Sequence, residues 1–351
     1  MASSGRVGLL VLALGFLGCQ RDTLAPEADV AGGPPPAFAK PGPPPPPPNP
    51  AIAFVEATDL KVMNADGSNQ TLVLDAGETS YEPSWSPDGT QIVFGSSIQG
   101  SGVYVIDVNG TNLRKVVATI TGGGATQPVW SPVPAPDGSF KIAYLDQAGP
   151  DDGTIEGDNH EVFLVNLDGT GRINLTNTRE LDERSPTWAP SAARLAAAPD
   201  KYTSQEPGVE GGIVVYDLGV GAGGTVTIVG QTNVTAAGPL SSAYSVFRPA
   251  WAKTHDKIAV VVFQTGSSLR DIWVIDLATP ASPTNITQTA SVSENSPSWS
   301  PDDLRIAFTR LNAKNKLSIF TMNADGSGVT EIGKPKSGLA GQSQPEWRRN
   351  P

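Results

Sequence analysis

Cysteine and histidine are almost missing from this chain of 351 residues, which contains one cysteine, Cys19, and two histidines, His160 and His255. A single cysteine cannot form a disulfide within the chain. Clusters of Cys and His are the usual ligands of structural zinc, so a zinc site of that type is nearly excluded. The composition therefore argues against disulfide scaffolds and zinc proteins.

Positive charge is also scarce. Lys and Arg number 24 against 35 Asp and Glu, which gives a net charge of −11. Nucleic-acid binding requires a basic footprint, so we expect no nucleic-acid partner. The same balance disfavours a long contact with anionic lipid, and the simplest role of the acidity is solubility.

Long apolar runs are absent as well, because the stretch Val7 to Gly18 is only a dozen residues long. A helix needs about 20 residues to cross a bilayer core. With Arg6 before it, residues 1–18 are typical of a signal peptide for export. Such a protein is exported to the cell envelope or beyond it.

The end of that segment, Leu17-Gly18-Cys19, resembles a bacterial lipobox, although Phe16 stands where the motif usually has Leu. The resemblance implies that Cys19 carries lipid and anchors the protein to the envelope, with Gln20 favouring the outer membrane and periplasm. The alternative is an ordinary secretory signal that is cleaved elsewhere. In either case the membrane is a partner only through an anchor.

Residues 19–50 form a predicted Pro-rich, disordered linker. The run Pro34 to Pro50 is mostly proline, with six in succession from Pro43 to Pro48. Such a run favours an extended polyproline II rod. We interpret it as a tether that holds a domain away from a membrane, with a ligand for an aromatic-lined groove as the alternative.

A repeat dominates the remainder, residues 51–351. Pro-x-Trp occurs six times, with successive separations of 45, 58, 63, 48 and 48 residues, and only Trp273 lies outside the pattern. Periods of roughly 40–50 residues are typical of propeller blades. The six tryptophans, which we expect to be core residues rather than ligand contacts, are Trp85, Trp130, Trp188, Trp251, Trp299 and Trp347.

Each repeat predicts four strands, a to d. Strand a carries Pro-x-Trp and ends in a Pro-Asp-Gly turn such as Pro87-Asp88-Gly89, and an Asn-Gly or Asp-Gly turn such as Asn109-Gly110 joins strands c and d. The chain starts with strands b, c and d, from Ala51, and ends with strand a, Gln344 to Trp347. We therefore predict an all-β fold: a six-bladed β-propeller of four-stranded antiparallel blades, closed by joining the two ends.

The motif Pro-x-Trp-Ser-Pro-Asp-Gly-x-x-Ile-Ala-Phe, followed by Asn-x-Asp-Gly, resembles the PD40 (WD40-like) repeat of TolB-type six-bladed propellers. Its fullest copy runs from Ser296 to Asp302 with Arg305 to Phe308, and the resemblance covers Ala51 to Arg349. The Trp188 and Trp251 units depart from it, because they lack Pro-Asp-Gly. The resemblance implies an envelope protein, but residues 20–50 cannot supply the N-terminal α/β domain of TolB itself.

The b–c and d–a loops vary in length, so we predict the face that they form as the binding face. Strand a lies nearest the central channel, and residues just before Pro-x-Trp should ring its mouth. The alternative is a solvated channel with no specific ligand. The predicted binding residues are Tyr81, Glu82, Gln127, Glu183, Arg184, Phe247, Arg248, Glu294, Asn295 and Gln344.

An acidic loop that contains Asp151, Asp152 and Asp158 is a weak candidate for Ca²⁺. A solvated acidic loop is the simpler interpretation, because the spacing does not match an EF-hand. We therefore expect no cofactor.

Two functions remain open. The first is a non-enzymatic, envelope-tethered, monomeric module that binds a protein, peptide or glycan. The second is a polysaccharide lyase or glycosidase that uses carboxylates at the channel mouth with Arg184 or Arg248. The sequence contains no Gly-x-Ser-x-Gly elbow. The absence of a recognisable set of catalytic residues favours the binding module, although a propeller fold alone is evidence for neither function.

Overall fold

The computed structural model describes residues 51–75, 77, 80–118, 126–147, 160–178, 181–201, 212–241, 244–264, 269–289, 291–335 and 341–349. The predicted signal peptide, Cys19, the linker and the acidic loop with Asp151, Asp152 and Asp158 lie outside these ranges. The described ranges hold strands and turns, and no helical segment with the length and hydrophobicity that spanning a bilayer requires.

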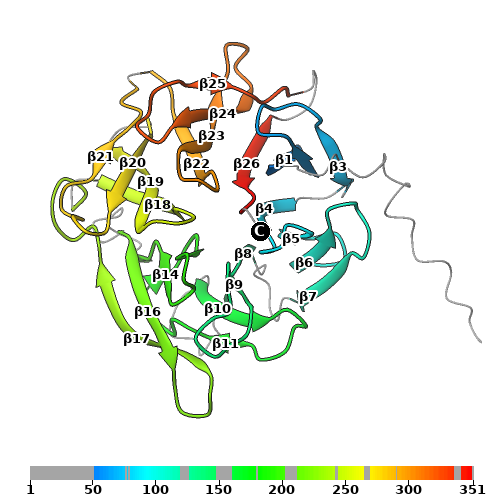
Figure 1. Cartoon of the computed structure of the whole chain (residues 1–351), viewed down its shortest axis with the longest axis vertical. Helices are drawn as coiled ribbons and strands as arrows, with labels where there is room; N and C mark the ends of the chain where they lie inside the picture. Colours follow the sequence, from blue (N-terminus) through cyan, green and yellow to red (C-terminus); the bar gives the residue numbers. More distant parts are fainter. Residues whose placement is uncertain are drawn as a thin grey trace, which may run out of the picture. The chain divides into compact units, whose positions relative to one another are not determined.

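Six four-stranded antiparallel sheets form the blades of a six-bladed β-propeller, as predicted (Figure 1). From inner to outer strand, blade 1 contains β4 (Ser80–Trp85), β5 (Gln91–Ser96), β6 (Gly102–Asp107) and β7 (Arg114–Ala118), and blade 2 contains β8 (Thr126–Trp130), β9 (Lys141–Gln147), β10 (His160–Asn166) and β11 (Ile173–Asn174). Blade 3 contains β13 (Thr187–Trp188), β14 (Arg194–Ala197), β16 (Val214–Val220) and β17 (Val226–Asn233), with the added ribbon β12 (Leu181–Asp182) and β15 (Asp200–Lys201). Blade 4 contains β18 (Tyr244–Trp251), β19 (Lys257–Gln264), β20 (Asp271–Asp276) and β21 (Thr284–Asn285), and blade 5 contains β22 (Glu294–Trp299), β23 (Arg305–Leu311), β24 (Leu317–Asn323) and β25 (Thr330–Glu331).

Blade 6 is assembled from both ends of the propeller. Its inner strand is β26 (Gln342–Trp347), and the chain start supplies β1 (Ile52–Glu56), β2 (Asp59–Met63) and β3 (Thr71–Leu74). Figure 1 shows β26 lying beside β1. Their antiparallel register confirms the predicted closure, in which the last strand of the chain pairs with the first.

The a–b turn of blade 1 is built from the Ser-Pro-Asp-Gly motif, Ser86 to Gly89. Ser86 Oγ donates to Asp88 Oδ1 over 2.6 Å and accepts the Gln91 amide, while the Thr90 amide donates to Asp88. Asp88 thus satisfies backbone donors that the tight turn would otherwise leave open. The Trp188 unit, which lacks Pro-Asp-Gly, still closes its turn through the Ala192 amide and the Ala189 carbonyl.

The c–d turns place glycine where blades meet. Gly326 has φ 86° and Gly67 has φ 80°, a region that non-glycine residues rarely adopt. A Cβ atom on Gly326 would also overlap the Ile286 carbonyl of the preceding blade, and one on Gly67 would overlap the Ile332 carbonyl. The turn glycine is therefore needed for its backbone conformation and for close blade packing.

The hydrophobic core consists of six clusters, each formed by two neighbouring blades. The repeat tryptophans are 2–6% exposed and lie in these clusters. Burying one such side chain contributes roughly 2–3 kcal/mol. The prediction that they are core residues is confirmed by their burial.

Hydrogen bonds between adjacent inner strands alternate around the ring. The indoles of Trp85, Trp188 and Trp299, in blades 1, 3 and 5, donate to backbone carbonyls of the preceding blade. In blades 2, 4 and 6 the backbone amide of the repeat tryptophan donates instead to a hydroxyl of the preceding blade, from Ser84, Thr187 and Ser298. The hydroxyl residues occupy the x of Pro-x-Trp in the odd blades, whereas Val129, Ala250 and Glu346 occupy it in the even ones. The ring therefore repeats in pairs of blades.

Candidate functional site

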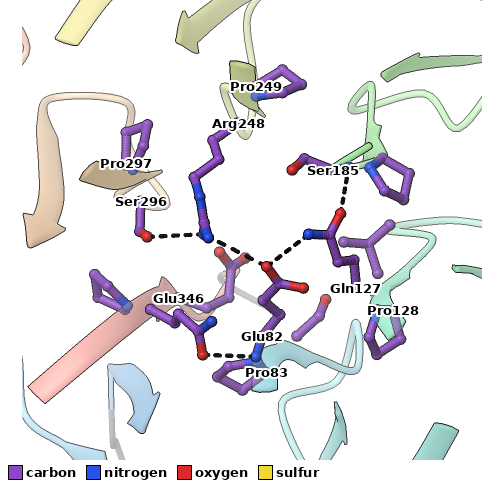
Figure 2. Close-up of a pocket in the computed structure, with 15 residues that line it drawn as sticks. Glu82, Pro83, Gln127, Pro128, Ser185, Arg248, Pro249, Ser296, Pro297 and Glu346 are labelled. Carbon is purple, nitrogen blue, oxygen red and sulfur yellow. Dashed lines mark hydrogen bonds and ion pairs between the residues drawn. The ribbon is translucent and has the colours of Figure 1, made fainter. Parts of the chain in front are cut away.

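A pocket lies in the central channel, where the inner strands of all six blades contribute to its wall (Figure 2). Each blade presents its Pro-x-Trp proline together with the residue before it. Prolines lack an N–H, so much of the wall is apolar and the polar groups on it are few. The side chains directly before the prolines belong to Glu82, Gln127, Ser185, Arg248, Ser296 and Gln344.

All six of these residues have positive φ, between 49° and 54°. Where five of the blades reach this point, the register between strands a and b shifts, as between Tyr81 and Ser84 and between Asn295 and Ser298. A bulge of this kind redirects a side chain out of the usual alternation of a strand. Figure 2 shows Glu82, Gln127 and Arg248 converging in the pocket.

The channel side chains form hydrogen bonds between blades. Gln127 Oε1 accepts the Ser185 amide over 2.5 Å, and its Nε2 donates to Glu82 Oε1 over 3.0 Å. Gln344 Oε1 accepts the Glu82 amide over 3.0 Å. The channel thus holds its polar side chains in fixed positions.

Arg248 and Glu82 carry opposite charges in the pocket. Arg248 Nη1 lies 3.5 Å from Glu82 Oε1 and donates to Ser296 Oγ over 3.1 Å. The two side chains are 31% and 20% exposed. Burial raises the pKa of Glu82, while Arg248 and the Gln127 amide act in the opposite direction. The Glu82 carboxylate is therefore held in place by Arg248 and Gln127, but these partners do not fully compensate for its burial.

A second ion pair lies at the edge of the same pocket. Lys253 Nζ is 2.7 Å from Glu346 Oε1, and Ser298 Oγ donates to Glu346 Oε2 over 2.8 Å. Burial lowers the pKa of Lys253, and Glu346 partly offsets this effect. Glu346 is thus a second carboxylate on the pocket wall, held by two partners.

Four predicted binding residues line the cavity: Glu82, Gln127, Arg248 and Gln344. Glu183 and Glu294 do not, since both are 0% exposed and lie between blades. Glu183 accepts a hydrogen bond from Thr178 Oγ over 2.7 Å, and Glu294 accepts one from Thr289 Oγ. Burial, reinforced by the neighbouring Glu161 carboxylate, raises the pKa of Glu183 to about 8, and burial raises that of Glu294 to about 7.

Arg184, Phe247 and Asn295 also lie outside the cavity wall. Arg184, with its side chain 56% exposed, pairs with Asp182. Phe247 packs edge-on against Phe263, with ring centroids 5.7 Å apart. Asn295 Oδ1 accepts the Ser296 amide over 2.9 Å. Tyr81 belongs to β4, whose register shifts at this residue. Their binding role stays a prediction.

The sequence interpretation missed Ser185 and Ser296 as wall residues. Both stand directly before the repeat proline, like the four that were found. Position relative to that proline is the signal that identifies them. Among the described residues, no group of three or more His, Cys, Asp or Glu is placed to hold a metal ion. We therefore interpret the chemistry of the pocket from the side chains on its wall.

Comparison with known proteins concerns the fold. No protein-family model matches the chain. The Tol-Pal system protein TolB of Rhizorhabdus wittichii is 37% identical over 75 residues, which is 20% of this chain and 16% of that protein's length. Among solved structures, TolB of Acinetobacter baumannii has a TM-score of 0.66 at 21% identity, covering 86% of this chain and 67% of that one. A candidate TolB of Agrobacterium tumefaciens has a TM-score of 0.55 at 17% identity, covering 82% and 92%.

These similarities and the blade architecture agree. The repeat that resembles TolB-type propellers in sequence forms four-stranded blades, and TolB proteins are among its structural neighbours. The chain therefore has a six-bladed β-propeller whose fold is similar to that of TolB.

Proposed function

We propose that this protein is a non-enzymatic binding propeller of the bacterial cell envelope. Its partner is a protein or peptide that reaches the channel pocket from the b–c and d–a loop face. The observation that carries the proposal is the Glu82–Arg248 pair, which lies in a cavity built by all six blades. A rigid ring with few, fixed polar groups is suited to recognition of a small part of a partner.

The similarity to TolB supports the envelope location and the class of partner. One relative is named as a component of the Tol-Pal system, and an exported chain would meet components of that kind. The predicted signal peptide, lipidation at Cys19 and proline-rich linker are consistent with a propeller tethered to the outer membrane. A glycan is the alternative ligand class.

The enzymatic alternative has less support. Two carboxylates considered for catalysis, Glu183 and Glu294, are enclosed between blades and hydrogen-bonded to threonines. A general acid or base must come within hydrogen-bond distance of its substrate. Binding therefore remains the function that the arrangement supports best.

The experiment is site-specific photo-crosslinking in the envelope. A crosslinking amino acid replaces Arg184, an exposed residue on the proposed binding face; the control position is Leu304, which is 66% exposed on an a–b turn at the other end of the ring. We expect one envelope protein to be captured from position 184 and not from 304. Capture from both positions, or from neither, would contradict the proposal.

A further inference from the structure

The even blades of the ring contain one departure from their shared pattern at the channel. In blades 2 and 6 the residue before the repeat proline is a glutamine, and its Oε1 accepts the backbone amide of the matching residue in the next blade. Gln127 bonds the Ser185 amide in this way, and Gln344 bonds the Glu82 amide. Blade 4 has Arg248 at the same position, and the corresponding amide is that of Ser296.

Arginine cannot accept a hydrogen bond, so it cannot do what the two glutamines do. The Ser296 amide instead donates to Asn295 Oδ1 over 2.9 Å. The backbone donor is therefore satisfied without residue 248, and the fold does not require a cation there. The guanidinium is directed toward the cavity, where Ser296 Oγ and Glu82 Oε1 are its described polar partners.

The contact with Glu82 leaves room for a competitor. Glu82 belongs to blade 1 and Arg248 to blade 4, two blades that face each other across the ring, and their nearest described atoms are 3.5 Å apart. Charge-assisted hydrogen bonds between guanidinium and carboxylate are normally about 2.8 Å long and often bidentate. Arg248 has five N–H donors, of which one Nη makes both of the contacts described.

The geometry points to Arg248 as the anchor for a carboxylate of a partner peptide, bound in the channel by its guanidinium with Glu82 as the internal competitor. This inference rests on the proposed binding function and specifies its ligand. The carboxylate belongs to an acidic side chain or to a chain terminus. Because Glu82 and Glu346 also lie on the wall, a singly charged carboxylate suits the pocket better than a doubly charged phosphate.

The test uses the full chain labelled with ¹⁵N-arginine and acetate as the smallest carboxylate probe. The Nε–H signal of Arg248 is identified by its loss in Arg248→Gln, a variant that restores the glutamine pattern of blades 2 and 6. We expect a saturable shift of this signal with acetate that sodium chloride of equal ionic strength does not produce. In Glu82→Gln, acetate should bind about threefold tighter, which corresponds to roughly 0.65 kcal/mol and lies within the usual range for a partly exposed ion pair.

Three results would overturn the inference: no saturable shift with acetate, tighter binding of inorganic phosphate than of acetate, or binding of methylammonium that Glu82→Gln abolishes. If Arg248→Gln does not fold, the arginine signal that acetate shifts in wild type, and at lower acetate concentration in Glu82→Gln, is compared instead, because Arg248 is the arginine that contacts Glu82. If acetate fails while crosslinking from position 184 succeeds, the ligand class is wrong and the binding function stands. If acetate binds and crosslinking fails, Arg248 is a carboxylate site but the proposed binding of an envelope protein is wrong. Peptides with either a free carboxyl terminus or an internal Asp then separate the two sources.

Discussion

Ile52 in the first strand of the propeller lies opposite Trp347 in the last. Ile52 is 0% exposed and Trp347 is 2% exposed, and both belong to the cluster between blades 5 and 6. The pair therefore joins the two chain ends and packs blade 6 against its neighbour. We therefore expect the contact between Ile52 and Trp347 to contribute strongly to the stability of the closed ring.

Replacement of Trp347 by alanine should lower the free energy of unfolding by about 3–5 kcal/mol, because it removes a fully buried aromatic side chain and leaves a cavity. Urea denaturation followed by circular dichroism measures it. Trp273, which is only partly buried on β20, is the matched control, and its alanine variant should lose clearly less free energy of unfolding than the Trp347 variant. Equal losses of stability in the two variants would contradict a particular contribution of ring closure to stability.

Gly326→Ala should destabilise the propeller more than Gly138→Ala. Both glycines have positive φ, 86° and 81°, so both variants incur the roughly 1–2 kcal/mol cost of a left-handed alanine. Only the Gly326 variant also forces a Cβ atom against a carbonyl of the preceding blade, whereas a Cβ atom on Gly138 would have no atom within 4 Å apart from its chain neighbours. Melting temperatures of the two variants decide this; a similar decrease in both would refute tight blade packing at the c–d turns.

Stability should fall as pH rises from about 5 to about 8. The pKa of Glu183 is raised from its ordinary value of 4.5 to about 8, and burial also raises that of Glu161. The native state therefore binds more protons than the unfolded chain in this window, and the stabilisation is complete below about pH 4.5 and lost as pH rises through the native pKa. The slope is up to roughly 1.4 kcal/mol per pH unit for each proton.

Glu183→Gln tests this directly. A glutamine keeps the Oε1 atom that accepts from Thr178, and it can donate toward Glu161 at every pH. Urea midpoints measured between pH 5 and 8 should become flatter, and the variant should exceed wild type at pH 8. Exposed Glu331 provides the control substitution to Gln, which should leave the slope unchanged. An unchanged slope in Glu183→Gln would show that this pair does not hold a proton.

Cys19→Ala should release the protein from membranes. If Cys19 carries lipid, its removal eliminates acyl chains that each contribute about 0.8 kcal/mol per buried CH₂. Fractionation of cells that express the full chain measures the distribution. Continued recovery in the membrane fraction would rule out the anchor, while a soluble propeller of normal stability would support it.

The fold could be predicted from the sequence because each blade carries its own Pro-x-Trp, and a repeated local signal sets the number of blades. The channel wall was harder to predict. Strand alternation does not account for the positive φ of Ser185 and Ser296, which directs these residues inward. Glu183 and Glu294 stand three residues before the same prolines and lie instead between blades. The difference arises from a backbone bulge, which residue types alone do not reveal.

The alternating hydrogen bonds at the tryptophans restrict how this architecture can grow. The hydroxyl of each odd blade accepts a hydrogen bond from the tryptophan amide of the even blade that follows it. Inserting or deleting one blade would bring two blades of the same type together. Where two even blades meet, a tryptophan amide loses its hydroxyl acceptor, and where two odd blades meet, a hydroxyl loses its amide donor. Propellers made from these units should therefore change size by two blades at a time, and gene duplications that preserve packing should span about a hundred residues.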